Sequence, residues 1–183
     1  MTTLSAVFAI VRFQVVWLVF VIGAANGLWW PGVAGAAVLL AIQLAYAHNP
    51  RKELLFFALA IVIAAAAEVV FYTTDALIYS AHWPNELFAP IWIFGLWLAF
   101  ATAIPATISL LATHAAFKSA LLGLIFGPVA YYGAAQYGAI TIGEPFWVKL
   151  AVIGIAWALV FPAMIKSYEL LIGSDNQTRL TRT

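Results

Sequence analysis

The sequence contains no cysteine and few charged residues among its 183 positions. The absence of cysteine excludes a disulfide-stapled scaffold, a thiolate zinc site, an iron–sulfur cluster and cysteine-based catalysis. Charged residues make up 8% of the chain, against roughly 25% in ordinary soluble domains. That is too little polar surface for a water-soluble domain, whereas a disordered chain would be rich in charge. A formal net charge of +1 also provides no broad basic surface for nucleic acid.

Apolar residues account for 66% of the sequence. They stand in long runs rich in Ala and Leu, which favour membrane-spanning helices of about 20 residues over the alternating strands of a barrel. We therefore predict an all-α, polytopic integral membrane protein with six transmembrane helices in one domain, residues 1–172, and a polar cytoplasmic tail, residues 173–183. The expected helices are Leu4–Ala25, Pro31 to before His48, Arg51 to at least Tyr72, Ala89–Thr113, Lys118–Gln136 and Phe146–Leu171.

Lys and Arg predict which side of the membrane each loop occupies, because basic residues are enriched on the cytoplasmic side. If the N-terminus is inside, all basic residues after the first helix except Lys149 fall on the cytoplasmic side. Those residues are Arg51, Lys52, Lys118, Lys166, Arg179 and Arg182. We predict an N-in/C-in arrangement. The alternative is a cleaved signal peptide, with Arg12 before the apolar run 13–22 and small residues at 23–25.

An ionisable group inside a membrane-spanning helix is costly, so each one suggests a functional site. Glu68 follows four alanines in the outer half of the third predicted helix. If that helix continues past Tyr72, further polar residues share its face, because they lie 4, 7 and 11 positions after Glu68. They are Tyr72, Asp75 and Tyr79. We predict an outward-pointing polar stripe, with Glu68 and Asp75 as the candidate catalytic residues.

Polar and aromatic residues of other helices fall at a similar depth and predict an outward-facing cavity. Pro128 removes a helical N–H donor and is expected to kink its helix one turn before Tyr131, which should then lie nearer the cavity than Tyr132. The residues expected to line the cavity are Asn26, Tyr72, Trp92, Trp97, Pro128, Tyr131 and Gln136. The alternative is that the tyrosines and tryptophans belong to the interfacial aromatic belt of membrane proteins.

Motifs for metal binding and for common catalytic chemistries are absent from the sequence. The three histidines, His48, His82 and His114, are not spaced as metal ligands, and we expect no metal and no cofactor. No Gly-x-Ser-x-Gly elbow, phosphate-binding loop or dinucleotide fingerprint occurs. Arg12 is expected to extend its side chain to the inner headgroups. The sequence alone therefore leaves open whether the protein is an enzyme.

Two stretches of aromatic and small residues resemble motifs of a known family. The first is Pro90-Ile-Trp92, then Leu96-Trp97 and Phe100, which resembles a P-x-W … L-W-x-x-F stretch. The second, Gly127-Pro128-Val-Ala-Tyr131-Tyr-Gly133, resembles a G-P-x-x-Y-x-x-G stretch, and residues 157–162 resemble the family's last helix. The family is found in bacterial inner membranes and is known only as domain of unknown function 2878.

The resemblance covers most of the chain and implies a multi-pass protein of the bacterial inner membrane. It also implies an acid on the third helix, for which Glu68 or Asp75 is the candidate. Relatives are often encoded beside fatty-acyl-modifying enzymes and photo-oxidative stress regulators, which implies a role in membrane-lipid modification or the stress response.

The sequence thus predicts a pocket for a lipid or another amphipathic molecule, with membrane lipids as the partners and any membrane-protein partner unidentified. Two alternatives remain. In one, the protein is a small transporter or channel subunit with Glu68 as a proton or cation site. In the other, it is a structural membrane scaffold.

Overall fold

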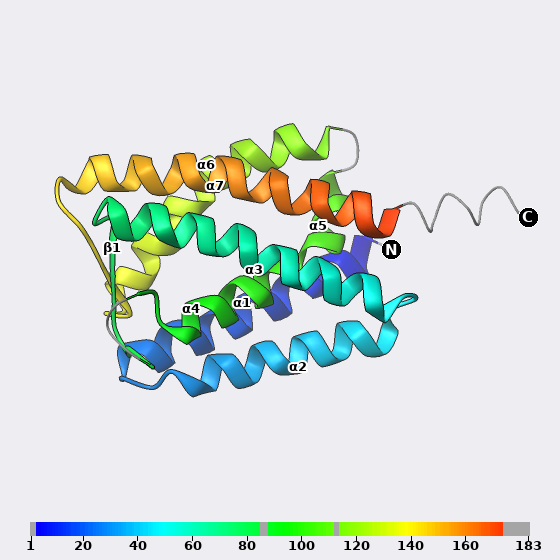
Figure 1. Ribbon diagram of the computed structural model, residues 1–183, viewed down its shortest axis with the longest axis horizontal. Coiled ribbons are helices and arrows are strands. Elements are labelled where there is room, and N and C mark those ends of the chain that lie inside the picture. The colour runs from blue at the N-terminus through cyan, green and yellow to red at the C-terminus, as the bar shows by residue number, and fades with distance from the viewer. Residues whose placement is uncertain (1–2, 85–87, 112–113, 174–183) are drawn as a thin grey trace, which may run out of the picture.

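In the computed structural model the chain forms a bundle of helices with a small two-stranded ribbon at one end (Figure 1). The structure describes residues 3–84, 88–111 and 114–173, so the predicted tail lies almost entirely outside the described residues. The helices are α1 (Thr3–Ala25), α2 (Trp30–Tyr46), α3 (Pro50–Thr73), α4 (Ile91–Ala101), α5 (Ile104–Leu111), α6 (Ala115–Gln136) and α7 (Phe146–Tyr168), which continues into a π-helical turn, η1 (Glu169–Gly173). The ribbon pairs β1 (Leu77–Tyr79) antiparallel with β2 (Ile140–Ile142).

Proline and glycine mark several helix boundaries as the sequence indicates. α2 and α3 each have a proline in the first turn, where its missing N–H has no intrahelical partner in any case. The Asn49 side chain caps α3 by accepting a hydrogen bond from the backbone N–H of Lys52 at 3.3 Å. Gly27 and Gly138 follow α1 and α6 with φ values of 75° and 83°, a backbone conformation that glycine adopts without strain.

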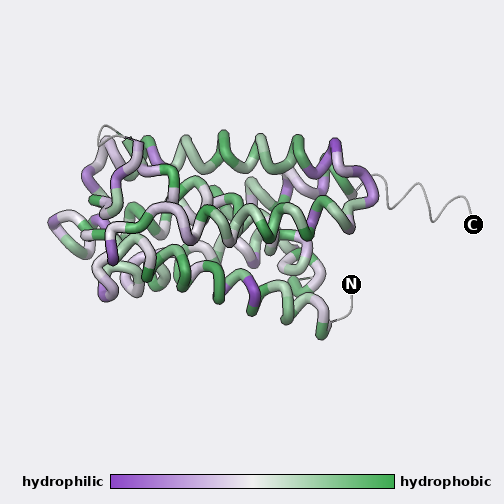
Figure 2. Tube along the Cα trace, turned by 90° about the horizontal axis from the view of Figure 1, so that it is seen from below, coloured by the Kyte–Doolittle hydropathy of each residue, from purple (hydrophilic) through white to green (hydrophobic). Residues whose placement is uncertain are grey.

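Several helices are long and apolar enough to cross a membrane. α1, α3, α6 and α7 with η1 meet this condition singly, and α4 with α5 meets it as a pair bent by 41°. α2 is apolar but has only 17 residues. Hydrophobic residues run along the middle of the bundle, and most hydrophilic residues gather near its two ends (Figure 2). These features indicate a multi-pass membrane protein.

The prediction of one unbroken helix over Ala89–Thr113 is wrong. The helix begins at Ile91, breaks after Ala101 and resumes at Ile104, and residues 112–113 lie outside the described residues. Pro105 explains the break, because it has no N–H to bond to the carbonyl of Ala101 and its ring clashes with the preceding turn. At the break, the buried Thr102 hydroxyl donates a hydrogen bond to the carbonyl of Ala99 at 2.7 Å.

The predicted polar stripe from Glu68 to Tyr79 is also wrong as a helical face, because α3 ends at Thr73. The hydroxyls of Thr73 and Thr74 donate to the carbonyls of Val69 and Val70 at 2.8 and 2.6 Å. The N–H groups of Asp75 and Ala76 turn back to the carbonyls of Tyr72 and Phe71 at 3.2 and 2.8 Å, which closes the last turn and ends the helix. Asp75 then adopts a φ of 50°, and the chain turns back along the end of the bundle as β1.

α6 and α7 pack closely through small residues. A Cβ at Gly123 would overlap the backbone carbonyl of Trp157, and one at Gly127 would overlap the Trp157 ring. By contrast, α1 packs against α2, α4 and α5 but not along α6. The bundle is therefore tight between α6 and α7 and open between α1 and α6.

Candidate functional site

Glu68 lies inside the bundle with none of its surface exposed. Its two carboxyl oxygens each accept one hydrogen bond. The Tyr79 hydroxyl donates to Oε2 at 2.5 Å, and the Trp97 indole N–H donates to Oε1 at 2.8 Å. A buried carboxyl satisfied in this way is fixed in position, and α3, β1 and α4 each contribute one residue to it. We call these three residues the Glu68 centre.

The ribbon positions Tyr79 through the alternation of strand side chains. Leu77 and Tyr79 face the bundle and are buried, whereas Ile78 between them is exposed. Tyr79 pairs with Ile140 across the ribbon, and the Trp92 indole N–H donates to the backbone carbonyl of the next residue, Ser80, at 2.9 Å. The ribbon is thereby held across the end of α3 and α4, where it covers the Glu68 centre.

Aromatic rings of α3, α6 and α7 lie around the Glu68 centre. The Trp97 ring stacks on Trp157 of α7 at 4.6 Å between ring centroids, with 19° between the ring planes. Tyr131 of α6 meets Phe71 and Trp157 edge-on at 5.7 and 6.4 Å. Its hydroxyl lies close enough to Glu68 and Tyr79 to interact electrostatically with both. Helices α4, α6 and α7 thus meet at Trp97.

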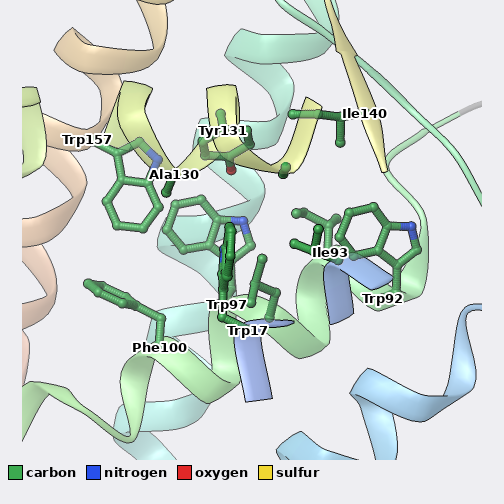
Figure 3. Close-up of a pocket in the computed structure, with 12 residues that line it drawn as sticks. Trp17, Trp92, Ile93, Trp97, Phe100, Ala130, Tyr131, Ile140 and Trp157 are labelled. Atoms are coloured by element: carbon green, nitrogen blue, oxygen red, sulfur yellow. The ribbon is translucent and has the colours of Figure 1, made fainter. Parts of the chain in front are cut away.

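A small cavity of about 50 Å³ lies beside Trp97 (Figure 3). Its surface is almost entirely apolar, and Tyr131 points its hydroxyl toward the centre of the group. Neither carboxyl oxygen of Glu68 lines it, because the Trp97 ring reaches the cavity while the Trp97 N–H reaches Glu68. The lining residues are Trp17, Val21, Trp92, Ile93, Leu96, Trp97, Phe100, Ala130, Tyr131, Ala134, Ile140 and Trp157.

A second, larger space of about 620 Å³ adjoins the first between α1 and α6. We call it the α1–α6 groove. α4, α5 and α7 contribute its remaining walls, and Gln14 and Thr107 are its polar side chains. Four residues line both spaces, so the groove and the small cavity adjoin at these side chains. They are Trp17, Phe100, Ala130 and Trp157.

The structure brings together three of the residues singled out from the sequence. Trp92, Trp97 and Tyr131 line the small cavity, and Pro128 packs nearby against Gly154 within a continuous α6. Tyr131 is 7% exposed and Tyr132 is 47% exposed, so only the first of the two faces the bundle interior.

Four other residues singled out from the sequence lie away from the cavity. Tyr72 is 56% exposed on α3 and contacts Phe88, and Asp75 is exposed in the turn after α3. Gln136 is exposed at the end of α6. The Asn26 amide turns back to donate to the carbonyl of Ile22 at 2.8 Å. All four stand at or beyond helix ends, where a small shift in the boundary changes the direction of the side chain.

Sequence reasoning missed a second buried acid, Glu53, which is 6% exposed near the start of α3. Its Oε2 accepts from the Gln43 amide at 2.7 Å, and its Oε1 accepts from the Tyr168 hydroxyl at 3.2 Å. Glu53 follows two basic residues in the sequence and therefore resembles a solvated interfacial acid. Gln43 within an apolar helix was the available signal, since a buried amide needs a polar partner.

Among the described residues, no three His, Asp or Glu side chains are grouped so that they could hold a metal ion. The Glu68 centre offers one carboxyl group, one phenol and one indole. The three side chains can hydrogen-bond a polar or charged part of a ligand, or a proton can pass between the carboxyl and the phenol.

Comparison with known families matches residues 6–163 to the family described as protein of unknown function (DUF2878). The chain belongs to this family. The match confirms the resemblance found in the sequence motifs. No curated protein and no solved structure matches the chain. Residues that carry the DUF2878 resemblance also meet in space, since Trp92, Leu96, Trp97, Phe100 and Tyr131 all line the small cavity.

Proposed function

We propose that this DUF2878 protein crosses the bacterial inner membrane six times. In this arrangement α4 and α5 form one bent span, and α2 crosses with its 17 residues, which extend about 25 Å. Both ends of the described chain lie at the end of the bundle opposite the ribbon, which supports an even number of crossings (Figure 1). The distribution of Lys and Arg supports a cytoplasmic location for those ends and an external location for the ribbon.

The protein binds a lipid or another amphipathic molecule in the α1–α6 groove, with the polar end beside the Glu68 centre. The observation that carries this proposal is an apolar space of about 620 Å³ that adjoins the small cavity beside Trp97, the residue whose N–H holds the buried Glu68 carboxyl. Ligand sites commonly have volumes of roughly 300–1,000 Å³ and combine apolar walls with a few fixed polar groups. The groove lies between two helices that make few contacts with each other in the described structure, and a lipid chain enters between them from the side.

The bound molecule connects the protein with membrane-lipid modification or the stress response, as an enzyme or as an accessory protein. The gene neighbourhood implied for the family supports this connection. The motif residues around the small cavity support a ligand site there, because several of the residues that carry the family resemblance line it.

Transport of a proton or a cation is the second candidate function. The observation in its favour is a carboxyl buried within a spanning helix, whose hydrogen-bond partners Tyr79 and Trp97 are uncharged. In this case solute or proton flux changes on deletion of the gene while the lipid profile does not.

A gene deletion followed by lipid mass spectrometry tests the proposed function. We expect an altered acyl or headgroup profile that the wild-type gene restores and Ala130→Phe does not, because the new ring fills the junction of the two spaces. The matched control is Ala151→Phe, the same change at an exposed position of α7. Unchanged lipids after deletion would contradict a role in lipid modification, and membrane abundance of each variant is measured alongside.

A further inference from the structure

Both hydrogen-bond partners of the Glu68 carboxyl, Tyr79 and Trp97, are uncharged. Tyr79 and Trp97 both donate to the carboxyl group, and an indole N–H can only donate. Neither cavity is lined by Lys, Arg or His. The described structure therefore pairs the Glu68 carboxyl with two uncharged donors and with no protein cation.

The small cavity next to this carboxyl is built mainly from aromatic rings. Half of its twelve lining residues are aromatic, and they come from four helices. The face of an aromatic ring is electronegative and attracts cations, most strongly for tryptophan. The rings are those of Trp17, Trp92, Trp97, Phe100, Tyr131 and Trp157.

Trp97 connects the carboxyl to the cavity. Its N–H donates to Glu68 at 2.8 Å while its ring lines the cavity and stacks on Trp157. A hydrogen bond to a carboxylate shifts electron density into the indole ring and so strengthens the attraction of its face for a cation. The cavity thus combines the electronegative faces of aromatic rings with walls that offer almost no hydrogen-bond acceptor.

We propose that the occupant of the α1–α6 groove is an amphiphile with a quaternary ammonium head. The ammonium lies in the small cavity against the aromatic rings, and the hydrocarbon chain lies in the groove. A primary ammonium needs acceptors for its three N–H groups, which this cavity does not provide, whereas a quaternary ammonium needs none. The inference rests on the proposed binding of an amphipathic molecule and specifies its chemical class.

Equilibrium dialysis with radiolabelled amphiphiles of one chain length tests this inference. The probes are decyltrimethylammonium, decylammonium, decyl maltoside and decyl sulfate, added to the purified protein in phosphatidylglycerol nanodiscs with empty nanodiscs subtracted. We expect decyltrimethylammonium to bind at least about tenfold more tightly than each of the others, as cation–π attraction in a desolvated site implies. Ala130→Phe should abolish binding of all four probes, and Ala151→Phe should leave it unchanged.

Two variants test the contribution of charge and of the rings. Glu68→Gln can accept from Trp97 with its oxygen and donate to the Tyr79 oxygen with its amide, so the fold is retained while the charge is removed. Trp157→Leu keeps an apolar wall but removes an aromatic face. Each should lose the preference for decyltrimethylammonium over decyl maltoside while still binding the maltoside.

The outcomes separate this inference from the proposed function. The proposal of a quaternary ammonium head is contradicted if all four probes bind equally, or if the preference for decyltrimethylammonium survives in both Glu68→Gln and Trp157→Leu. Either result leaves the proposed binding of an amphiphile intact. Tighter binding of decylammonium than of decyltrimethylammonium also contradicts the quaternary ammonium head, in favour of a primary amine. If every probe binds Ala130→Phe as tightly as it binds the wild-type protein, the proposed amphiphile site itself is contradicted.

Discussion

Glu68 and Tyr79 are joined by a short hydrogen bond inside the bundle, with 2.5 Å between the phenol and carboxyl oxygens. Water has little access to replace either side chain, because Glu68 is fully buried and Tyr79, on the buried face of β1, is only 9% exposed. The energetic consequence of losing one partner is therefore larger here than at an exposed pair.

Tyr79→Phe should lower the free energy of unfolding by about 1–3 kcal/mol, because Oε2 of Glu68 loses its donor in a water-excluded site. Tyr132→Phe is the matched control, since Tyr132 is 47% exposed, and it should change stability little. Thermal or denaturant unfolding in detergent, followed by circular dichroism, measures the difference. Equal stability of the two variants would show that the Tyr79 bond contributes nothing.

Glu68→Gln should leave the protein folded and at normal membrane abundance, for the hydrogen-bonding reason given above. If the carboxyl transfers a proton, activity in the lipid or flux assay should fall by roughly 10²–10⁴-fold. Complementation of the deletion strain, with abundance measured by immunoblot, provides the readout. Full activity at normal abundance would end the hypothesis that a proton is exchanged at Glu68.

At the scale of elements, the α6–α7 pair is the closest packed part of the bundle, and glycine makes it so. Gly123 and Gly127 face Trp157, while Gly154 of α7 faces the backbone of Leu124. Because glycine has no side chain, the two helix backbones can approach each other closely at these positions. Small residues have the same effect at other contacts between membrane helices. This close contact also brings Trp157 to the wall of the small cavity.

Gly123→Ala should therefore destabilise the protein by about 1–3 kcal/mol, because the added methyl group overlaps the Trp157 backbone and forces α6 and α7 apart. Gly133→Ala on the same helix is the matched control. Its Cβ would meet only the Trp17 ring, at 3.6 Å, which is ordinary van der Waals contact. Unfolding temperatures of the two purified variants test the contrast, and an unaltered Gly123→Ala would contradict the close-packing argument.

At the scale of the whole molecule, the two ends of the bundle differ in charge and in structure. One end carries the ribbon, and the other carries both ends of the described chain (Figure 1). If the protein crosses the membrane six times with its N-terminus inside, as proposed, these two ends lie on opposite sides of the bilayer and the Glu68 centre lies under the external surface.

Reporter fusions test this topology. Fusions after Arg51, Lys118 and Arg179 should be cytoplasmic, and fusions near Asn85 and Glu144 should be external, because the basic loops are retained inside. Asn85 and Arg179 lie outside the described residues. An external signal after Lys118 would contradict the six-span arrangement, and a mature N-terminus near Ala25 would restore the signal-peptide alternative.

The helical membrane class and most helix limits could be predicted from the sequence alone. Long apolar runs leave a chain few options other than helices in a bilayer, and proline or glycine marks several ends of those helices. The presence of an unusual acid at Glu68 was also visible, because polarity within an apolar run is a local property. The break after Ala101 was harder to predict, since proline within an apolar run can either bend a helix or divide it.

Only the tertiary structure decided what surrounds that acid. Helical periodicity groups residues on one face of one helix, and it therefore placed Tyr72, Asp75 and Tyr79 beside Glu68, of which only Tyr79 contacts it, from a strand and not along the helix. The actual partners, Tyr79 and Trp97, stand 11 and 29 residues away and reach Glu68 through a chain reversal and a neighbouring helix. The α1–α6 groove likewise arises from which helices do not pack together, which depends on the arrangement of the bundle and leaves no pattern along the chain.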